Sequence, residues 1–124
     1  MNLTHACIMT EDVIKLRDFY REVLQLEGET FSTDYAEFET AVGRLGIFDL
    51  NFHNRVSNNS AKGKYNKTIL LEFSVDDVDA EYERIKNMGV EIIKELKNEV
   101  WGSRSFYFLD PDGNMISFFK VLKR

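Results

Sequence analysis

Five side chains in this sequence have the chemistry to transfer protons or to hold a polar ligand: His5, Cys7, Asp49, His53 and Glu72. An imidazole titrates near neutral pH, and a carboxylate facing inward binds a cationic group or acts as a base. His5 and Cys7 lie two residues apart on a predicted strand, about 7 Å by strand rise, which is too far for direct proton transfer. We therefore expect Cys7 to be a buried, inert thiol and not a nucleophile. For His5 the alternative is a hydrogen bond within the sheet, and for Glu72 it is a salt bridge to a lysine or arginine.

The sequence contains an internal repeat that places some of these residues. The pattern of residues 5–13, HACIMTEDV, returns 65 residues later as residues 70–78, LLEFSVDDV. In both copies an alternating apolar run meets two acidic residues and a valine, and an amphipathic helical pattern follows. A repeat of this length indicates a duplicated supersecondary unit. Where the first copy has His5, the second has Leu70.

Each half of the chain is predicted to have the order β-α-β-β-β. Apolar residues at helical spacing predict helices at about 12–24 and 77–88, capped by Thr10 or Asp12 and by Asp76-Asp77, with Gly89 ending the second. Asp110–Asn114 is expected to form a hairpin turn, and the polar residues 54–66 a linker or lid. Strands are expected at about 2–9, 26–33, 35–42, 45–53, 67–75, 91–99, 103–109 and 115–121.

Alternation along these strands separates two faces. In each half the uniformly apolar set should pack under the helix, and the mixed set should face a concavity. Such a mixture of polar and apolar groups suits a small-molecule pocket. An antiparallel sheet whose polar residues simply face solvent on one side has the same pattern. The residues expected on the concave face are His5, Cys7, Asp49, Asn51, His53, Glu72, Ser74, Met115, Ser117 and Phe119.

Composition bounds the class of protein. The chain has 124 residues, 44% of them hydrophobic, with 10 Phe and 5 Tyr, which is enough for one compact domain with a real core. The net charge is −5 and no basic stripe occurs, so we expect no nucleic-acid or anionic-membrane partner. No apolar run spans a bilayer and no signal peptide is evident. A single cysteine, Cys7, excludes an internal disulfide and favours a cytoplasmic location.

The order and spacing of several motifs resemble those of the vicinal oxygen chelate superfamily, the glyoxalase I, bleomycin-resistance and extradiol-dioxygenase group. The motifs are Phe19-Tyr20, the segment Val75–Ala80, Trp101-Gly102-Ser103-Arg104, and Asp110–Asn114. The resemblance implies an α+β fold in which two βαβββ modules form a cupped, mostly antiparallel eight-stranded sheet. Residues 1–124 would be one domain, with modules at about 1–53 and 67–124 joined by the linker 54–66. The resemblance also implies a homodimer, often with ligand sites shared between the two chains.

The same resemblance implies four metal-ligand positions, on the first and last strand of each module. They correspond here to His5, Asp49, Leu70 and Ser117. Leucine offers no lone pair and a serine hydroxyl is a poor ligand for a divalent ion, whereas a catalytic site normally takes at least three protein ligands. We therefore expect no cofactor.

Two other residues could complete an irregular site with His5. Glu72 lies two residues beyond Leu70, and His53 lies beyond Asp49. A shift of two residues along a strand is about 6.6 Å, so the usual coordination geometry would not survive. A divalent metal (Zn, Ni, Mn or Fe), with His5, Asp49 and Glu72 as candidate ligands, belongs only to the alternative that the chain is an enzyme.

The sequence thus favours a metal-free small-molecule-binding protein of the glyoxalase/bleomycin-resistance type, sequestering an antibiotic or metabolite without turnover. The rivals are a lyase, isomerase or dioxygenase with a non-standard metal site, and an interaction module whose dimer surface is its function. Trp101 and Arg104 belong to a motif that lies near the ligand groove in bleomycin-resistance-like members; the alternative is a sheet-edge or dimer contact. The candidate ligand-binding residues are His5, Asp49, His53, Glu72, Trp101, Arg104, Ser117 and Phe119. The sequence does not name the ligand.

Overall fold

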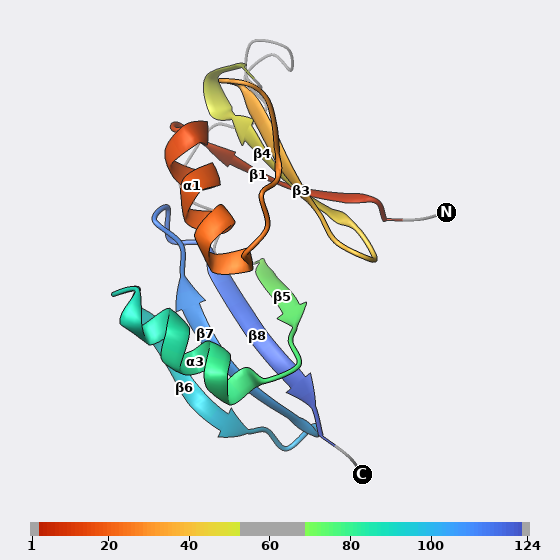
Figure 1. Cartoon of the computed structure of the whole chain (residues 1–124), viewed down its shortest axis with the longest axis vertical. Helices are drawn as coiled ribbons and strands as arrows, with labels where there is room; N and C mark the ends of the chain where they lie inside the picture. The colour runs from red at the N-terminus through yellow and green to blue at the C-terminus, as the bar shows by residue number, and fades with distance from the viewer. Residues whose placement is uncertain (1–2, 53–68, 123–124) are drawn as a thin grey trace. The chain divides into compact units, whose positions relative to one another are not determined.

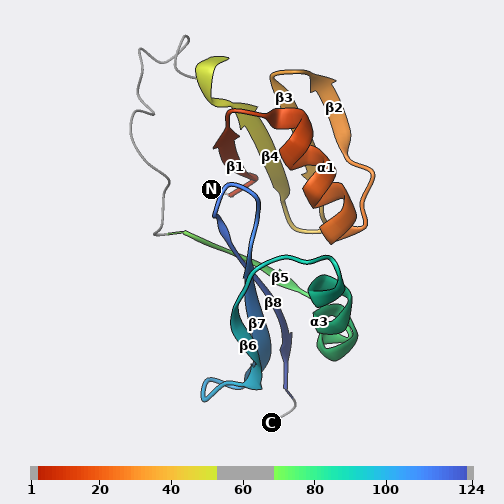
Figure 2. The same cartoon turned by 90° about the vertical axis from the view of Figure 1, so that its left-hand side faces the viewer.

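The computed structural model describes residues 3–52 and 69–122, and the chain divides into two compact units, residues 1–64 and 65–124. Each unit has one β-α-β-β-β module (Figures 1 and 2). The first contains β1 (His5–Thr10), α1 (Val13–Leu24), β2 (Glu29–Ser32), β3 (Tyr35–Glu39) and β4 (Arg44–Asp49). The second contains β5 (Leu70–Ser74), α3 (Val78–Asn87), β6 (Ile92–Asn98), β7 (Ser103–Leu109) and β8 (Met115–Val121). His53 and the expected linker 54–66 lie outside the described residues.

The strands form two four-stranded mixed sheets with the same topology. The strand order is β1-β4-β3-β2 in the first sheet and β5-β8-β7-β6 in the second. In each sheet the first strand of the module pairs in parallel with the last, and the other pairs are antiparallel. The duplication predicted from the sequence is therefore present in the topology, and each module builds its own sheet.

Both helices begin at the aspartates that the sequence predicts. The Asp12 side chain accepts a hydrogen bond from the backbone N–H of Lys15, and Asp77 accepts one from Ala80, each at 3.0 Å. Gly89, with φ of 77°, follows α3 in the left-handed conformation that glycine adopts without strain. The helix periodicity and the caps were thus sufficient to place both helices.

One face of each sheet is covered by its helix and holds the core of that unit. In the first unit α1 contributes Tyr20, which is fully buried together with Phe38 and Ile47 of the sheet. In the second unit Phe106 and Phe108 stack with ring centroids 5.6 Å apart. We call the opposite side of each sheet its open face. Because alternate residues of a strand face opposite sides, the pairing registers assign every strand residue to the helix-covered face or the open face.

The fourth strand ends earlier than the alternation predicts. We expected residues 45–53 to be extended, but β4 stops at Asp49 and residues 50–52 form a helical turn. The Asp49 carboxylate accepts a 2.8 Å hydrogen bond from the backbone N–H of Phe52, which caps this turn. The alternating apolar residues Phe48, Leu50 and Phe52 therefore do not belong to one strand. Phe48 lies in β4, whereas Leu50 and Phe52 lie in the helical turn after it.

The loop between β7 and β8 is a tight turn organised by Asp110, as expected. Its Oδ1 accepts hydrogen bonds from the backbone N–H groups of Asp112 and Asn114, at 2.9 and 2.8 Å, and Gly113 has φ of 83°. Within residues 3–52 and 69–122, neither helix has the length and apolar content that crossing a bilayer takes.

Candidate functional site

A polar cluster lies on the open face of the first sheet, where β1, β4 and β3 run side by side. The register aligns Cys7 with Gly46 and Glu37, and it aligns His5 with Arg44. Side chains aligned in this way project from the same face. The middle of this face is therefore polar although the core beneath it is apolar.

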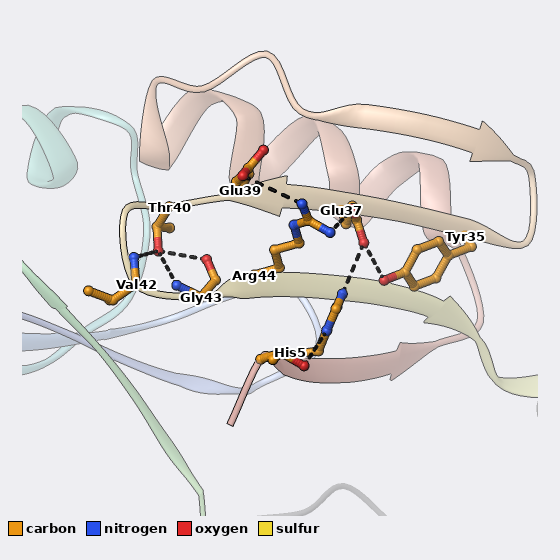
Figure 3. Close-up of polar contacts among 9 residues, drawn as sticks. His5, Tyr35, Glu37, Glu39, Thr40, Val42, Gly43 and Arg44 are labelled. Atoms are coloured by element: carbon orange, nitrogen blue, oxygen red, sulfur yellow. Dashed lines mark hydrogen bonds and ion pairs between the residues drawn. The ribbon is translucent and has the colours of Figure 1, made fainter. Parts of the chain in front are cut away.

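Glu37 is the centre of this cluster (Figure 3). Its Oε2 accepts a 2.8 Å hydrogen bond from the Tyr35 hydroxyl and lies 3.6 Å from Nε2 of His5. Its Oε1 lies 3.7 Å from Nη1 of Arg44, and only 12% of its side chain is exposed. His5 is also bonded through Nδ1 to Thr4 Oγ1 at 2.9 Å. A mostly buried carboxylate with a hydrogen-bond donor beside one oxygen and a cationic group beside the other is held in one orientation.

Cys7 and Tyr35 meet above Gly46. A Cβ atom at position 46 would lie 2.8 Å from both the Cys7 Sγ and the Tyr35 hydroxyl oxygen, so only glycine leaves room for them. Burial and the hydrogen bond to Glu37 raise the pKa of Tyr35 above its ordinary value. Burial also raises the pKa of Cys7; its hydrogen bond with Tyr35 lowers this pKa, and the charge of Glu37 raises it further. The Cys7 residue is nevertheless exposed, which differs from the buried thiol expected.

Asp49 does not join His5. The register pairs Asp49 with Thr10, and Thr10 faces the opposite side of β1 from His5 because the two are five residues apart. Asp49 therefore belongs to the helix-covered face, where it caps the turn after β4. The expectation that both residues share the concave face is wrong for Asp49, because the apolar run used to orient the strand includes residues of the turn.

The open face of the second sheet carries Glu72, Ser117 and Phe119, as the alternation predicts. Glu72 and Tyr107 are the cross-strand neighbours of Ser117 on its two sides, and Phe119 lies between Ser74 and Ser105. Ser117 is fully buried, and its Oγ has no hydrogen-bond partner within residues 3–52 and 69–122. Glu72 is exposed, and no cationic side chain among residues 3–52 and 69–122 pairs with it. The salt bridge considered for Glu72 is thus absent from the described part of the chain.

Lys94, on the neighbouring strand β6, contacts several acceptors of the second sheet. It forms an ion pair with Glu99, whose side chain is only 7% exposed. Its Nζ also donates to the backbone carbonyl and to the hydroxyl of Ser105, both at 2.9 Å, and lies 4.7 Å from the centroid of the Tyr107 ring. Burial, with the negative charges of Glu72 and Glu99, raises the pKa of Tyr107.

Arg104 lies on the other face of this sheet. It shares a side of β7 with Phe106, and its Nη2 and Nε donate to the Asp79 carboxylate of α3 at 2.8 and 3.1 Å. Its Nη1 also donates to the Asn98 side chain at 3.1 Å. Arg104 therefore fastens the helix to the sheet and is not a ligand-binding residue of the open face. Trp101 lies in the exposed turn between β6 and β7, with 59% of its surface accessible.

The four positions that the resemblance implies for a metal do not fit one. His5 is directed at Glu37, Asp49 faces the opposite side of the sheet, Leu70 has no donor atom, and Ser117 is a neutral hydroxyl. No group of three or more His, Cys, Asp or Glu side chains suited to an ion forms among the described residues, which exclude His53. A tetrahedral or octahedral site takes more donors than this set offers.

Sequence reasoning missed four members of these clusters: Glu37, Arg44, Lys94 and Glu99. Glu37 had a usable signal, because Tyr35, Glu37 and Glu39 alternate with Ala36 and Phe38. The same alternation places Phe38 in the core, where it is fully buried. No sequence signal indicated Lys94 and Glu99, because register shifts interrupt the pairing of β6 with β7.

Two β-α-β-β-β modules, each with a polar open face, define a known class of protein, and comparison with known proteins agrees. A family model described as the Glyoxalase/Bleomycin resistance protein/Dioxygenase superfamily matches residues 2–118. The chain belongs to this superfamily. A crystal structure of a glyoxalase/bleomycin resistance protein/dioxygenase family enzyme from Burkholderia phytofirmans has the same fold, with a TM-score of 0.88 at 20% identity, over 98% of this chain and 100% of that one.

Two relatives have more specific names. The bleomycin resistance protein of Geobacillus stearothermophilus is 37% identical over 57 residues, which are 45% of this chain and 43% of that protein. The fosfomycin resistance protein FosX of Listeria monocytogenes is 26% identical over 91% of this chain and 84% of its own length. The matched stretch thus spans less than half of the bleomycin resistance protein and most of FosX.

Proposed function

We propose that this chain is a metal-independent small-molecule-binding protein that sequesters its ligand on the open faces of its sheets without turnover. The observation that carries the proposal is the separation of His5 from Asp49 on opposite faces of the first sheet. With Leu70 and Ser117 at the other two positions, the described residues do not bring together the donors that an ion needs, and this supports the proposal. The partial sequence similarity to a bleomycin resistance protein also supports the proposal of small-molecule binding.

The Glu37 cluster is the recognition element of the first module. Its carboxylate is held by Tyr35, His5 and Arg44, so it is oriented before any ligand arrives. Preorganised polar groups lower the entropy lost on binding. Exposed Phe31 lies beside Tyr35, with ring centroids 5.7 Å apart, and offers an aromatic surface to a planar group.

Calorimetry in the presence of EDTA, with bleomycin and fosfomycin as probes, tests the proposal. We expect binding of at least one probe that EDTA does not reduce, and a loss of roughly tenfold in affinity in Glu37→Gln. Glu11→Gln is the control, because Glu11 is an exposed carboxylate outside the Glu37 cluster. Binding that needs added metal would contradict the proposal.

Direct titration with zinc, nickel, manganese and iron gives a second measurement. We expect no stoichiometric submicromolar site. A tight site in the wild-type chain that is lost in His5→Ala would show that the donors do assemble on ligation, and the metal-independent proposal would then fail.

The second candidate is an enzyme, and it is supported by the similarity to the metallothiol transferase FosB of Staphylococcus epidermidis, which is 25% identical over 93% of this chain and 78% of its own length. It would be a lyase, isomerase or dioxygenase that uses His5, Asp49 or His53, and Glu72 around an irregular metal. This candidate predicts that added metal restores turnover of fosfomycin, a hemithioacetal or a catechol, and that Glu72→Gln abolishes it. Absence of turnover with every metal would eliminate it.

We also propose that the chain is a cytoplasmic homodimer. Its single cysteine and acidic balance support this location, and the family resemblance supports the dimer. Light scattering coupled to size-exclusion chromatography should show twice the chain mass of 14.5 kDa. A monomeric mass would refute the dimer.

A further inference from the structure

On the open face of the second sheet, a carboxylate without a cationic partner among the described residues lies beside a buried hydroxyl that has no hydrogen-bond partner among them. Ser117 Oγ projects from the centre strand β8 and has no hydrogen bond, although the residue is fully buried. Leaving a buried hydroxyl unsatisfied is unfavourable, so such groups are uncommon in folded proteins unless a ligand or water completes them. Nothing in the packing of the core uses this hydroxyl, because it faces away from the helix.

The groups around Ser117 determine which kind of ligand group could form a hydrogen bond with its hydroxyl. Glu72 flanks it on the edge strand β5, and Tyr107 flanks it on β7. Cross-strand neighbours have Cβ atoms about 5 Å apart, so the side chains of Glu72 and Tyr107 border the position of Ser117. The Ser117 hydroxyl is buried and Glu72 is exposed, so a ligand group that contacts all three side chains has to displace the atoms that cover the hydroxyl.

The charges around Glu72 and Ser117 favour a cationic ligand group over an anionic one. The positive charge of Lys94 is matched by Glu99, with which it is paired, while Glu72 has no cationic partner among the described residues. An anion would meet two carboxylates here. A carboxylate is acceptor-only, and both hydroxyls can accept, so the fitting group carries several N–H donors.

We propose that Glu72, Ser117 and Tyr107 form a subsite for a protonated primary amine of the ligand. Glu72 takes the charge, Ser117 Oγ accepts one N–H, and the Tyr107 hydroxyl oxygen accepts another. This inference rests on the proposed small-molecule-binding function and adds to it the chemical class of one ligand group.

The test is an NMR titration of the full-length protein in EDTA with benzylamine hydrochloride, and with benzyl alcohol as the uncharged probe. We expect benzylammonium to shift the amide signals of Glu72 and Ser117 and their strand neighbours, and to bind at least tenfold more tightly than benzyl alcohol. Glu72→Gln should weaken benzylammonium at least tenfold. Glu83→Gln, an exposed carboxylate on α3, is the control and should change nothing.

Ser117→Ala distinguishes a binding role from a structural one. We expect it to raise the melting temperature, because an unsatisfied hydroxyl is removed, and to weaken benzylammonium several-fold. A purely structural serine would not affect the affinity. Equal affinity in Glu72→Gln, or in Ser117→Ala, would overturn the subsite, and so would equal binding of the two probes.

The two proposals fail separately. If bleomycin or fosfomycin binds without metal but benzylammonium shifts no signal near Glu72, the subsite is wrong and the proposed function stands. If benzylammonium binds at Glu72 but both antibiotics need added metal, the metal-independent function is wrong and the subsite stands.

Discussion

Gly46 and Tyr35 are so close that a methyl group at position 46 would lie 2.8 Å from the tyrosine hydroxyl oxygen. The glycine thus makes room for the phenol that orients Glu37. Because the open face above β4 is occupied by Tyr35 and Cys7, the absence of a side chain at this one position shapes the cluster.

We predict that Gly46→Ala destabilises the protein by about 1–3 kcal/mol, since Tyr35 and Cys7 must move to admit the new Cβ. It should also weaken any ligand that depends on Glu37. Urea denaturation measures the first effect and calorimetry the second. Gly43→Ala is the control: its Cβ would meet only the Thr4 carbonyl oxygen, at an ordinary 3.6 Å. Equal stability of the two variants would contradict the packing described.

Two buried serines of the second sheet should respond in opposite directions to alanine. The Ser117 hydroxyl has no hydrogen-bond partner in the described part of the chain, so Ser117→Ala should stabilise the protein by about 1 kcal/mol. Ser105 accepts a hydrogen bond from Lys94 at 2.9 Å, so Ser105→Ala should destabilise it by about 1–2 kcal/mol. Thermal and urea unfolding measure both changes. A loss of stability in both variants would show that Ser117 is satisfied in solution.

Alkylation of Cys7 should report the charge of Glu37. Burial raises the pKa of the thiol, its hydrogen bond with Tyr35 lowers this pKa, and the Glu37 carboxylate raises it, so Glu37→Gln should lower it. The variant should react faster with iodoacetamide at pH 8, because more thiolate is present. Tyr35→Phe should react more slowly, since the hydrogen bond that favours the thiolate is lost. Cys7 is the chain's single cysteine, so the rate has one source.

The matched control for this measurement is Glu39→Gln, which removes an exposed carboxylate from the same strand. We expect its rate to equal that of the wild type. An unchanged rate in Glu37→Gln as well would mean that the carboxylate does not influence the thiol.

The ion pair between Asp79 and Arg104 should make stability depend on pH in the acid range. The hydrogen bonds from Arg104 hold the pKa of the Asp79 carboxyl below its ordinary value. A lowered folded-state pKa contributes stability that is present above the unfolded value, about 4, and is lost as pH falls through the folded one. Asp79→Asn should therefore be less stable than the wild type at pH 6, and the difference should close on acidification and shrink in high salt. A difference that is constant from pH 6 to pH 2 would argue against this pair.

The helices and the second open face were predictable from local patterns. Asp12 and Asp77 cap their helices because a short carboxylate before an amphipathic run satisfies free N–H groups, whatever the rest of the fold does. Glu72 and Ser117 share a face because β5 and β8 are regular over the whole alternating stretch. In these segments the local signal and the tertiary structure agree.

The first open face could not be predicted in the same way. Alternation divides a strand into two sets of residues but leaves open where the strand ends, and Asp49 ends β4 by capping a turn. Arg104 likewise has a motif position that indicates a ligand groove, while its guanidinium contacts Asp79, 25 residues away in sequence.

The sequence by itself determined the duplicated order of elements, the helix boundaries, and the loss of donor atoms at positions 70 and 117, because these depend on residue types and their spacing. Only the tertiary structure decided that His5 faces Glu37 while Asp49 faces the core, and that Ser117 lies between Glu72 and Tyr107 without a partner. The physical reason is register: which side chains meet across a sheet is set by how separate strands align, and that alignment results from the packing of the whole module.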